Sequence, residues 1–513
     1  MTDRPNVLLI LTDEQRLSTM SAYGATPCRT PHLDKLASES VVFENAYTSC
    51  PVCSPARASI MTGLFPHNHG FTSNAGNLGC SVSELPDSPI LLSRMLERAG
   101  YQLGYTGKWH LGTNPVERKA AFFDGYGRAA GRVSAKENPY RLPDDVRYRH
   151  IVPSHVGFQG HDFAGHGGGG FRYSQYQAYL RDHGYEHRVT DEWKIGPQRA
   201  GILAGPLEAT VPYFLTTESI GLIDRFTAAA AEPEPFFLWH NFWGPHAPYY
   251  MTREFYDLYE GVEIPEWPNF RWPARKTAGP HRMMMKAGAR DMEWSDWAAY
   301  IRYYYAFMTM IDSQIGRLMD HLCDSGLLEN TVIIFAADHG EALGGHGGIY
   351  NKGQTHFEEI QRIPFLIRLP GGARGGGRVN ELVSLVDIYP TVCDLAGASF
   401  ERDRCDGESL RPLLDGSAGS WRESVAVEYN GLGNACQTMR TIRNDRFKYG
   451  FTFGSSEELY DLEADPHEMV NLASDSAYRK DKREARDQLL HWMHETGDFG
   501  VINHLREYIG LVE

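Results

Sequence analysis

Several short stretches of the chain are rich in apolar residues, and longer stretches, in which apolar residues are spaced further apart, separate them. An apolar run of four to eight residues is typical of a strand that is covered on both faces of a sheet. Such strands are predicted at Val7–Leu11, Tyr101–Tyr105, Phe236–Trp239, Thr331–Phe335 and Pro364–Arg368. Other elements must therefore cover both faces of that sheet.

Between these runs, apolar residues recur every three or four positions, which is the spacing of one helix face. Helices are predicted at Thr30–Leu36, Ser88–Gly100, Tyr303–Cys323 and Ser384–Ala396. Strands that alternate with helices in this way indicate an α/β fold, in which helices flank a mostly parallel central sheet.

The pattern changes after about residue 400. Met439–Arg443 and Arg446–Tyr449 flank an Asn-Asp pair, which predicts a hairpin, and a polar helix follows near 478–496. We therefore expect a catalytic domain at 1–400 and a smaller α+β subdomain at 401–513, with a small antiparallel sheet and a helix. Residues 113–215 are rich in Gly, His and Tyr with weak periodicity, and we expect there a loop-rich insertion that shapes the substrate site.

Charge and hydropathy narrow the classes of partner. The chain has 513 residues and a formal net charge of −15. This charge disfavours nucleic acid as a partner, because binding to its phosphates requires clustered Lys and Arg. No apolar run approaches the roughly 18 residues of a membrane helix, so no membrane association is predicted.

Eight cysteines are scattered along the chain, and the first residues carry no pattern of a secretory leader. We therefore expect reduced thiols and a cytoplasmic protein. The C-terminal segment Phe499–Glu513 is a candidate surface for docking on a second subunit, which would make the protein a homo-oligomer.

Acidic residues follow two of the predicted strands directly. Asp13 and Glu14 come after Val7–Leu11, and Asp338 and His339 come after Thr331–Phe335. In parallel α/β sheets, ligands bind outside the carboxyl ends of the strands, so the two clusters are expected to meet at one edge. Three carboxylates and a histidine suit a hard divalent cation, although either cluster alone is equally well explained as a solvated turn.

Cys53 opens a segment with unusual chemistry. Pro55 and Gly63 predict a helix that begins near Cys53, and Arg57 lies in its first turn, where an anion would be favoured. A buried structural cysteine is one alternative. A zinc or redox motif formed with Cys50 is another, but no second Cys/His pair with matching spacing accompanies it.

The run Cys53-x-Pro55-x-Arg57 resembles the signature of type I sulfatases, a family of the alkaline phosphatase superfamily, and Gly107–Gly112 resembles that family's second signature. Further segments match in the family's order: Thr12–Gln15, Asp338–Glu341, Asp406–Leu410, Glu458–Leu462 and Asn471–Ala473. The resemblance covers most of the chain and is weakest over 113–215. It implies an alkaline-phosphatase-like fold and a sulfuric ester hydrolase.

The resemblance also implies a modified nucleophile and a metal. Cys53 would be oxidised to formylglycine by a formylglycine-generating enzyme, and its hydrate would ligate one divalent ion together with Asp13, Glu14, Asp338 and His339. Calcium is the expected metal, with manganese and magnesium as alternatives. Position 14 is more often Asp or Gln in the family, so Glu14 is a departure that lengthens the reach of this carboxylate.

Catalytic roles follow from the same resemblance. Arg57, Lys108 and Lys352 would neutralise the charge of the sulfate ester. One hydroxyl of the formylglycine hydrate would attack sulfur, and His110 would deprotonate the second hydroxyl so that sulfate leaves. His246 or Lys352 would protonate the leaving alcohol.

The substrate expected from this chemistry is an aryl sulfate or another small organic sulfate. Phe242, Trp243, Tyr249 and Tyr250 flank His246 and would either stack on such a group or pack in the core. A phosphonate monoester hydrolase or phosphodiesterase is the first alternative, although those relatives typically have Tyr and Thr in place of Lys108 and His110. An unmodified, non-catalytic metal-binding protein is the second alternative.

Overall fold

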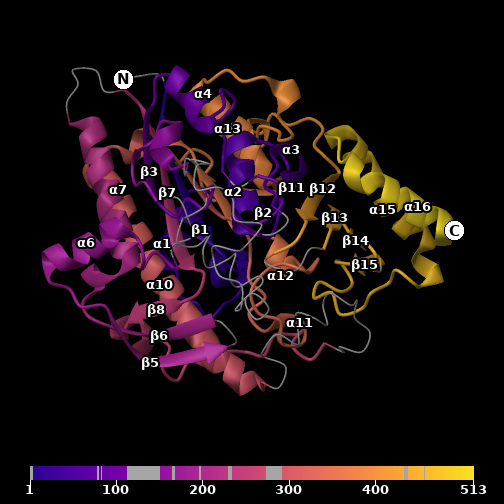
Figure 1. Ribbon diagram of the computed structural model, residues 1–513, viewed down its shortest axis with the longest axis horizontal. Helices are drawn as coiled ribbons and strands as arrows, with labels where there is room; N and C mark the ends of the chain where they lie inside the picture. Colours follow the sequence, from indigo (N-terminus) through magenta and orange to yellow (C-terminus); the bar gives the residue numbers. More distant parts are fainter. Residues whose placement is uncertain are drawn as a thin grey trace, which may run out of the picture.

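The computed structural model describes residues 4–77, 80–82, 84–112, 151–163, 168–195, 198–228, 234–272, 292–432, 437–455 and 457–512. Its largest element is an eight-stranded sheet that lies between two layers of helices (Figure 1). The strands occur in the order β11 (Arg378–Ser384), β2 (Val41–Tyr47), β10 (Phe365–Arg368), β9 (Thr331–Ala337), β1 (Asn6–Asp13), β7 (Phe236–Pro245), β3 (Gln102–Gly107) and β4 (Gln159–Gly160).

Only β10 in this sheet runs against its neighbours, β2 and β9, and the other pairs are parallel. The prediction of an α/β fold with a mostly parallel central sheet is therefore confirmed. All eight residues of β1 are buried, as its continuous apolar run indicates.

Successive residues of β1 face two different cores. Leu8 and Ile10 belong to a core with α1 (Pro31–Ser38), α6 (Ser174–His183), α7 (Val211–Thr227) and α10 (Trp294–Asp324). Val7, Leu9 and Leu11 belong to a core on the opposite face, with α2 (Cys53–Thr62), α4 (Leu92–Arg98) and α13 (Ile388–Ala396). Side chains alternate between the two faces of a strand, so one apolar run supplies both cores.

Helix α10 begins earlier than the sequence pattern predicts. Its apolar stripe continues from Tyr303 back to Trp297, Tyr300 and Ile301, which are all buried. The helix therefore starts at Trp294 instead of Tyr303 and covers much of one face of the sheet.

A second sheet carries the C-terminal part of the chain. It is an antiparallel meander of β12 (Ser424–Tyr429), β13 (Met439–Asn444), β14 (Phe447–Thr452) and β15 (Glu457–Asp461). Two C-terminal helices, α15 (Arg479–Thr496) and α16 (Phe499–Val512), lie along this sheet and share its apolar core (Figure 1). The hairpin predicted around Asn444 corresponds to β13 and β14, whereas a domain boundary near residue 400 stays a prediction.

Within the segment predicted as an insertion, residues 113–150 lie outside the described part. The described remainder contributes α6 and part of a three-stranded sheet of β5 (Arg188–Ile195), β6 (Gln198–Ala204) and β8 (Tyr249–Thr252). The described part also contains shorter α-helices: α3 (Pro66–His69), α8 (Arg253–Asp257), α11 (Gly345–Gly348), α12 (Glu358–Gln361) and α14 (Arg411–Asp415).

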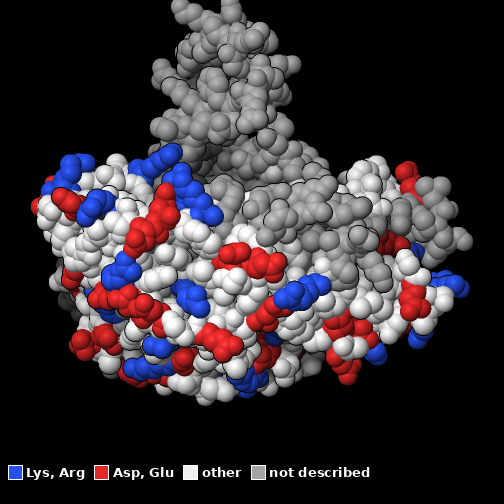
Figure 2. Space-filling view, turned by 90° about the horizontal axis from the view of Figure 1, so that it is seen from below, with Lys and Arg blue, Asp and Glu red and all other residues white. Residues whose placement is uncertain are grey.

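Two further observations concern the described helices and the surface charge. None of the described helices combines the length and apolar character that crossing a bilayer requires. On the face shown in Figure 2, basic and acidic side chains are interspersed over the described surface.

Candidate active site

The carboxyl ends of β1 and β9 lie side by side. Thr12 pairs with Ala337 in the parallel ladder, and the Asp338 N–H donates to the Thr12 carbonyl at 3.0 Å. Glu14, the first residue after β1, has a φ of +63°, and its N–H donates to Asp338 Oδ1 at 3.1 Å. The two acidic segments therefore meet at one edge of the sheet, as parallel strands require.

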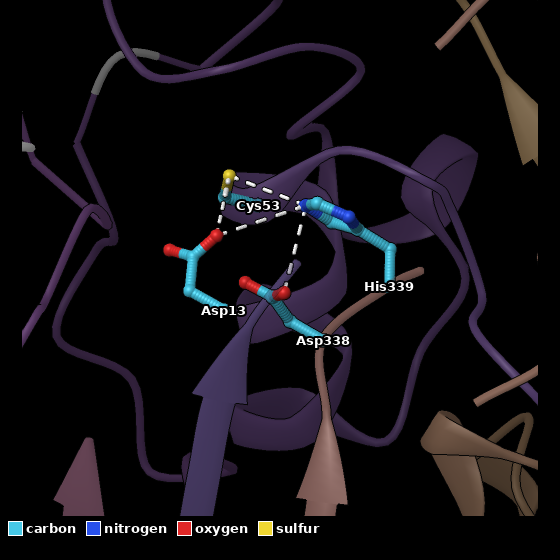
Figure 3. Close-up of side chains that lie close together, drawn as sticks. All are labelled: Asp13, Cys53, Asp338 and His339. Atoms are coloured by element: carbon cyan, nitrogen blue, oxygen red, sulfur yellow. Dashed lines mark hydrogen bonds and ion pairs between the residues drawn. The ribbon is translucent and has the colours of Figure 1, made fainter. Parts of the chain in front are cut away.

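Cys53 is the first residue of α2 and points at this edge. Val52 before it is extended, and Gly63 after the helix is left-handed, so the start and the end of α2 lie where the sequence predicts them. The Cys53 sulfur lies 3.6 Å from Asp13 Oδ1 and 3.4 Å from His339 Nε2. Figure 3 shows Asp13, Cys53, Asp338 and His339 converging on one point, and one ligand atom from each lies within 4.8 Å of the others.

Cationic side chains surround the same point. Arg57 NH2 lies 3.2 Å from Asp338 Oδ2 and 3.6 Å from Asp13 Oδ2, and the Lys108 ammonium also pairs with Asp13. Arg57 and Lys108 are completely buried. An anionic group that enters here would therefore meet fixed positive charge with little competing water.

Lys352 and His246 meet on the Glu14 carboxylate. Lys352 Nζ is 3.4 Å from Glu14 Oε2 and 3.0 Å from the Cys53 sulfur. His246 Nε2 is 3.3 Å from the same Glu14 oxygen, and its side chain is 15% exposed, so it lies nearer to solvent than the other members of the site.

His110 follows β3 and has a φ of +56°. Its carbonyl accepts a hydrogen bond from the Ser54 hydroxyl at 2.5 Å, which places His110 beside the residue that follows Cys53. The structure thus gathers Asp13, Glu14, Cys53, Arg57, Lys108, Asp338, His339, His246 and Lys352 through side-chain contacts, and it brings His110 to the site through its backbone.

Burial and fixed charge shift the pKa values of the site. Burial raises the pKa of the Cys53 thiol to about 11, although Lys352 opposes this, so an unmodified thiol is a poor nucleophile at neutral pH. Burial lowers the pKa of His339 to about 3, so its imidazole is neutral and can offer a lone pair. Burial would raise the pKa of Asp338, but His339 and the cations Arg57 and Lys108 outweigh burial and lower it.

Two residues of this region were not foreseen from the sequence. Asn241 Oδ1 accepts from Arg57 NH1 at 2.8 Å, and Arg16 NH1 donates to the carbonyls of Glu341 and Ala342. The signal for Asn241 was available, because a polar residue inside the buried strand β7 needs internal hydrogen-bond partners. Arg16 follows the acidic cluster at a turn and carries no comparable signal.

The aromatic residues near His246 differ in burial, and three of the four pack in the core. Phe242, Trp243 and Tyr249 are buried in the core, whereas Tyr250 is half-buried and donates to Glu192 Oε1 at 3.2 Å. Of these four, Tyr250 alone retains substantial exposure.

Comparison with known proteins agrees with this geometry. A family model described as Sulfatase matches residues 5–398, and one described as N-sulphoglucosamine sulphohydrolase, C-terminal, matches residues 344–495. The chain is 28% identical to an N-acetylglucosamine-6-O-sulfatase of Bacteroides thetaiotaomicron, over 94% of this chain and 85% of that protein. It is 26% identical to an arylsulfatase of Clostridium perfringens, over 93% and 92%, and 28% identical to a choline-sulfatase of Rhizobium meliloti, over 98% and 89%.

Among solved structures, a phosphonate monoester hydrolase of Agrobacterium radiobacter superposes with a TM-score of 0.76 at 25% identity, over 96% of both chains. This likeness agrees with the alkaline-phosphatase-like arrangement of the sheet. The match to the sulfatase model extends over most of the chain, from β1 through α13. We conclude that this chain belongs to the sulfatase family and is an enzyme that hydrolyses sulfate esters.

Proposed function

We propose that this enzyme cleaves sulfate monoesters of aryl or other small organic alcohols, with residue 53 acting as a formylglycine hydrate beside a divalent cation. The observation that carries this proposal is the convergence of Asp13, Cys53, Asp338 and His339 within 4.8 Å at the start of α2, among buried cations. The printed names of two relatives, an arylsulfatase and a choline-sulfatase, support small sulfate esters as substrates.

For the cation we propose calcium, with manganese and magnesium as alternatives. Asp13, Glu14 and Asp338 offer carboxylate oxygens, which hard cations prefer, and His339 offers a nitrogen, which suits manganese better. Glu14 Oε1 is buried and has no hydrogen-bond partner within the described part of the chain, so a bound cation would satisfy it. When bound, the cation neutralises charge on the nucleophile and on the sulfate.

The side chains of this chain then divide the remaining work. Arg57 and Lys108 hold the sulfate oxygens and offset the charge that is present in the transition state. Lys352 Nζ lies 3.0 Å from the Cys53 sulfur, which supports a role for Lys352 close to the reacting group. His246 shares the Glu14 carboxylate with Lys352, and either group can supply the proton that the leaving alcohol requires.

His110 is proposed as the base that removes a proton from the second hydroxyl of residue 53, so that sulfate is released and the aldehyde returns. The hydrogen bond between its carbonyl and Ser54 supports this role, because it fixes His110 next to the nucleophile. A left-handed backbone at a non-glycine residue is also typical of functional sites.

The test of the nucleophile is Cys53→Ser. Serine lacks the second hydroxyl, so the variant should transfer one sulfate to itself and stop, with a gain of one SO₃ group on the peptide that carries residue 53. The peptide from the natural enzyme, purified from its own host, should show the mass of formylglycine. An intact thiol in fully active protein would refute the proposal.

Phosphonate monoester hydrolysis is the second candidate function, favoured by the structural match to a phosphonate monoester hydrolase. The discriminating experiment compares kcat/KM for matched aryl sulfate, aryl phosphonate and phosphodiester substrates. We expect sulfate turnover to be the fastest, because this chain has Lys108 and His110 where phosphonate monoester hydrolases and phosphodiesterases typically have Tyr and Thr. Sulfate turnover far below the other two would reverse the order of the candidates.

We further propose that a formylglycine-generating enzyme matures the chain in the cytoplasm and that the enzyme assembles as a homo-oligomer through its C-terminal segment. The seven described cysteines are unpaired, which supports a reducing compartment. Cell fractionation tests the location, and light scattering of the chain with and without 499–513 tests the assembly. Enzyme found only outside the cytoplasm, or an unchanged mass after truncation, would contradict these proposals.

A further inference from the structure

Lys352 lies at the end of a loop whose backbone conformation is energetically unfavourable without contacts from other parts of the protein. Within 341–352, three non-glycine residues have left-handed backbones: Leu343 and His346 with a φ of +46° and Asn351 with a φ of +67°. L-residues adopt this region rarely and at a free-energy cost, so surrounding contacts must impose the conformation. The position of the Lys352 ammonium therefore depends on whatever holds this loop.

Side chains satisfy the backbone groups of the loop at both of its ends. The buried Glu341 carboxylate accepts from the Leu343 N–H at 2.9 Å and from the Asn351 N–H. Because these two donors stand at the beginning and the end of the loop, one carboxylate closes it immediately before Lys352.

Three successive carbonyls are held from outside the loop. Arg16 NH1 donates to Glu341 O at 3.0 Å and to Ala342 O at 2.7 Å, and Trp267 Nε1 donates to Leu343 O at 2.9 Å. The Arg16 guanidinium also lies over the Trp267 ring, 4.6 Å from its centroid. Stacking and the hydrogen bonds thus fix Arg16, Trp267 and the loop relative to one another.

Arg16 is itself fixed to the opposite side of the active site. Its N–H donates to the Tyr304 hydroxyl at 2.9 Å, and that hydroxyl donates to the Glu14 carbonyl at 2.8 Å. Its Nε donates to Ser18 Oγ at 3.1 Å. The segment that turns the Glu14 carboxylate inward therefore also reaches across to the loop of Lys352.

We propose that Arg16 is a positioning residue that sets the distance between the Lys352 ammonium and residue 53. This inference rests on the proposed catalytic role of Lys352. The Arg16 side chain donates to two backbone carbonyls and stacks on Trp267, which holds the third carbonyl. Within the described part of the chain, this side chain forms no hydrogen bond or ion pair with the residues proposed as metal ligands. Its loss should therefore impair leaving-group departure while metal binding persists.

The test is a double-mutant cycle of Arg16→Met and Lys352→Ala. Arg16→Met should lower kcat by about 10- to 100-fold, because a misplacement of about 1 Å can cost that much. In the Lys352→Ala background, Arg16→Met should have less than a threefold further effect, since residues that act as a unit are not additive. The loss should also grow as the leaving phenol becomes more basic, while metal content per chain stays at the wild-type level.

A matched control is Arg317→Met. Arg317 also stacks on an aromatic ring, with its guanidinium carbon 3.9 Å from the Tyr213 centroid, and its NH1 donates to the Tyr213 carbonyl at 3.3 Å. In contrast to Arg16, it joins α10 to α7 and not to the loop of Lys352. This variant should keep wild-type kcat. Arg16→Lys, which retains the charge without the planar stacking group, gives a second variant with an intermediate loss if Arg16→Met folds poorly.

The outcomes separate this inference from the proposed function. Equal effects of Arg16→Met with and without Lys352 would overturn the positioning role while leaving the role of Lys352 intact. Full activity of Lys352→Ala would overturn the proposed role of Lys352 and the inference that rests on it. Reduced metal content in Arg16→Met would also overturn the inference, because the residue would then act through the cation site.

Discussion

His67 is expected to make the stability of the protein depend on pH through a contact between α3 and the C-terminal sheet. Its Nδ1 lies 2.5 Å from Glu428 Oε1 on β12, and its Nε2 lies 3.0 Å from the Thr496 carbonyl at the end of α15. Both partners accept hydrogen bonds, so both ring nitrogens must carry protons. Burial would lower the pKa of His67, but the Glu428 carboxylate outweighs it and raises the pKa to about 9.

The size of the effect follows from this shift. The difference between about 9 in the folded protein and about 6.5 in the unfolded chain corresponds to about 3 kcal/mol, at 1.36 kcal/mol for each pH unit. Because the folded pKa is the higher one, the stabilisation is complete below pH 6.5 and disappears as the pH rises through about 9. Arg440, 3.4 Å from Glu428 Oε2, and the carboxylates of Asp498 and Asp406 are further charged groups in these surroundings.

The assay is thermal unfolding of wild type and His67→Gln between pH 6 and pH 9.5. At about 2.1 cal/mol/K per residue, 513 residues give an unfolding entropy near 1.1 kcal/mol/K, so about 3 kcal/mol displaces the midpoint by about 3 °C. The variant should melt about 3 °C below wild type at pH 6, and the two should converge by about pH 9.5. Trp492, whose ring centroid lies 5.7 Å from that of His67, provides a local fluorescence signal.

The control is His494→Gln, because the His494 side chain is 63% exposed and should contribute almost nothing to stability. If wild type and His67→Gln lost stability in parallel between pH 6.5 and pH 9, His67 would not be the group that titrates. A difference that persisted unchanged at pH 9.5 would show that packing, and not charge, accounts for the effect.

Three further predictions concern the site itself. Asn241→Ala removes a hydrogen bond to buried Arg57 that is worth about 1.5–3 kcal/mol. The kcat/KM of this variant should therefore fall about 10- to 100-fold while its metal content stays unchanged. Wild-type activity would contradict this prediction. Gly107→Ala places a methyl carbon 1.7 Å from the Asn241 carbonyl oxygen and should lower the melting midpoint by at least about 3 °C. The control Gly419→Ala has open space around the added carbon and should keep the wild-type midpoint. Equal midpoints for the two variants would refute the steric reasoning. Asp338→Asn should reduce bound metal, measured by elemental analysis, and lower activity by at least about 100-fold; a full complement of metal would remove this residue from the ligand set.

The sequence predicts those parts of the fold in which local pattern and tertiary environment agree. β1 and β9 are apolar throughout because both faces of each strand are covered, so their position and type could be read directly. β2 was missed because Glu44 and Asn45 interrupt its apolar run, and both are only half-buried. The reversed direction of β10 could not be predicted either, because a short apolar run looks the same in both orientations.

In the candidate site too, the features set by local sequence pattern could be predicted, and those set by distant contacts could not. The meeting of Asp13 with Asp338 could be foreseen, because both follow parallel strands and such ends share one edge. The link between Arg16 and Trp267 depends on a loop with left-handed residues, whose shape arises from contacts between segments far apart in the chain. No local pattern records such contacts, so the supporting residues emerge only in three dimensions.

All ten residues of α2 are buried, so an enzyme that carried out the proposed oxidation of Cys53 would have to reach it before the core closes. One contact beside α2 forms late in synthesis, since His67 on the neighbouring helix α3 pairs with Glu428, 361 positions further along the chain. A ribosome working at about 5–20 residues per second needs roughly 20–70 s to make that stretch. Under the proposed maturation, slower translation would therefore lengthen the interval in which Cys53 can be oxidised, and a chain that completed folding with its thiol intact would have lost that opportunity.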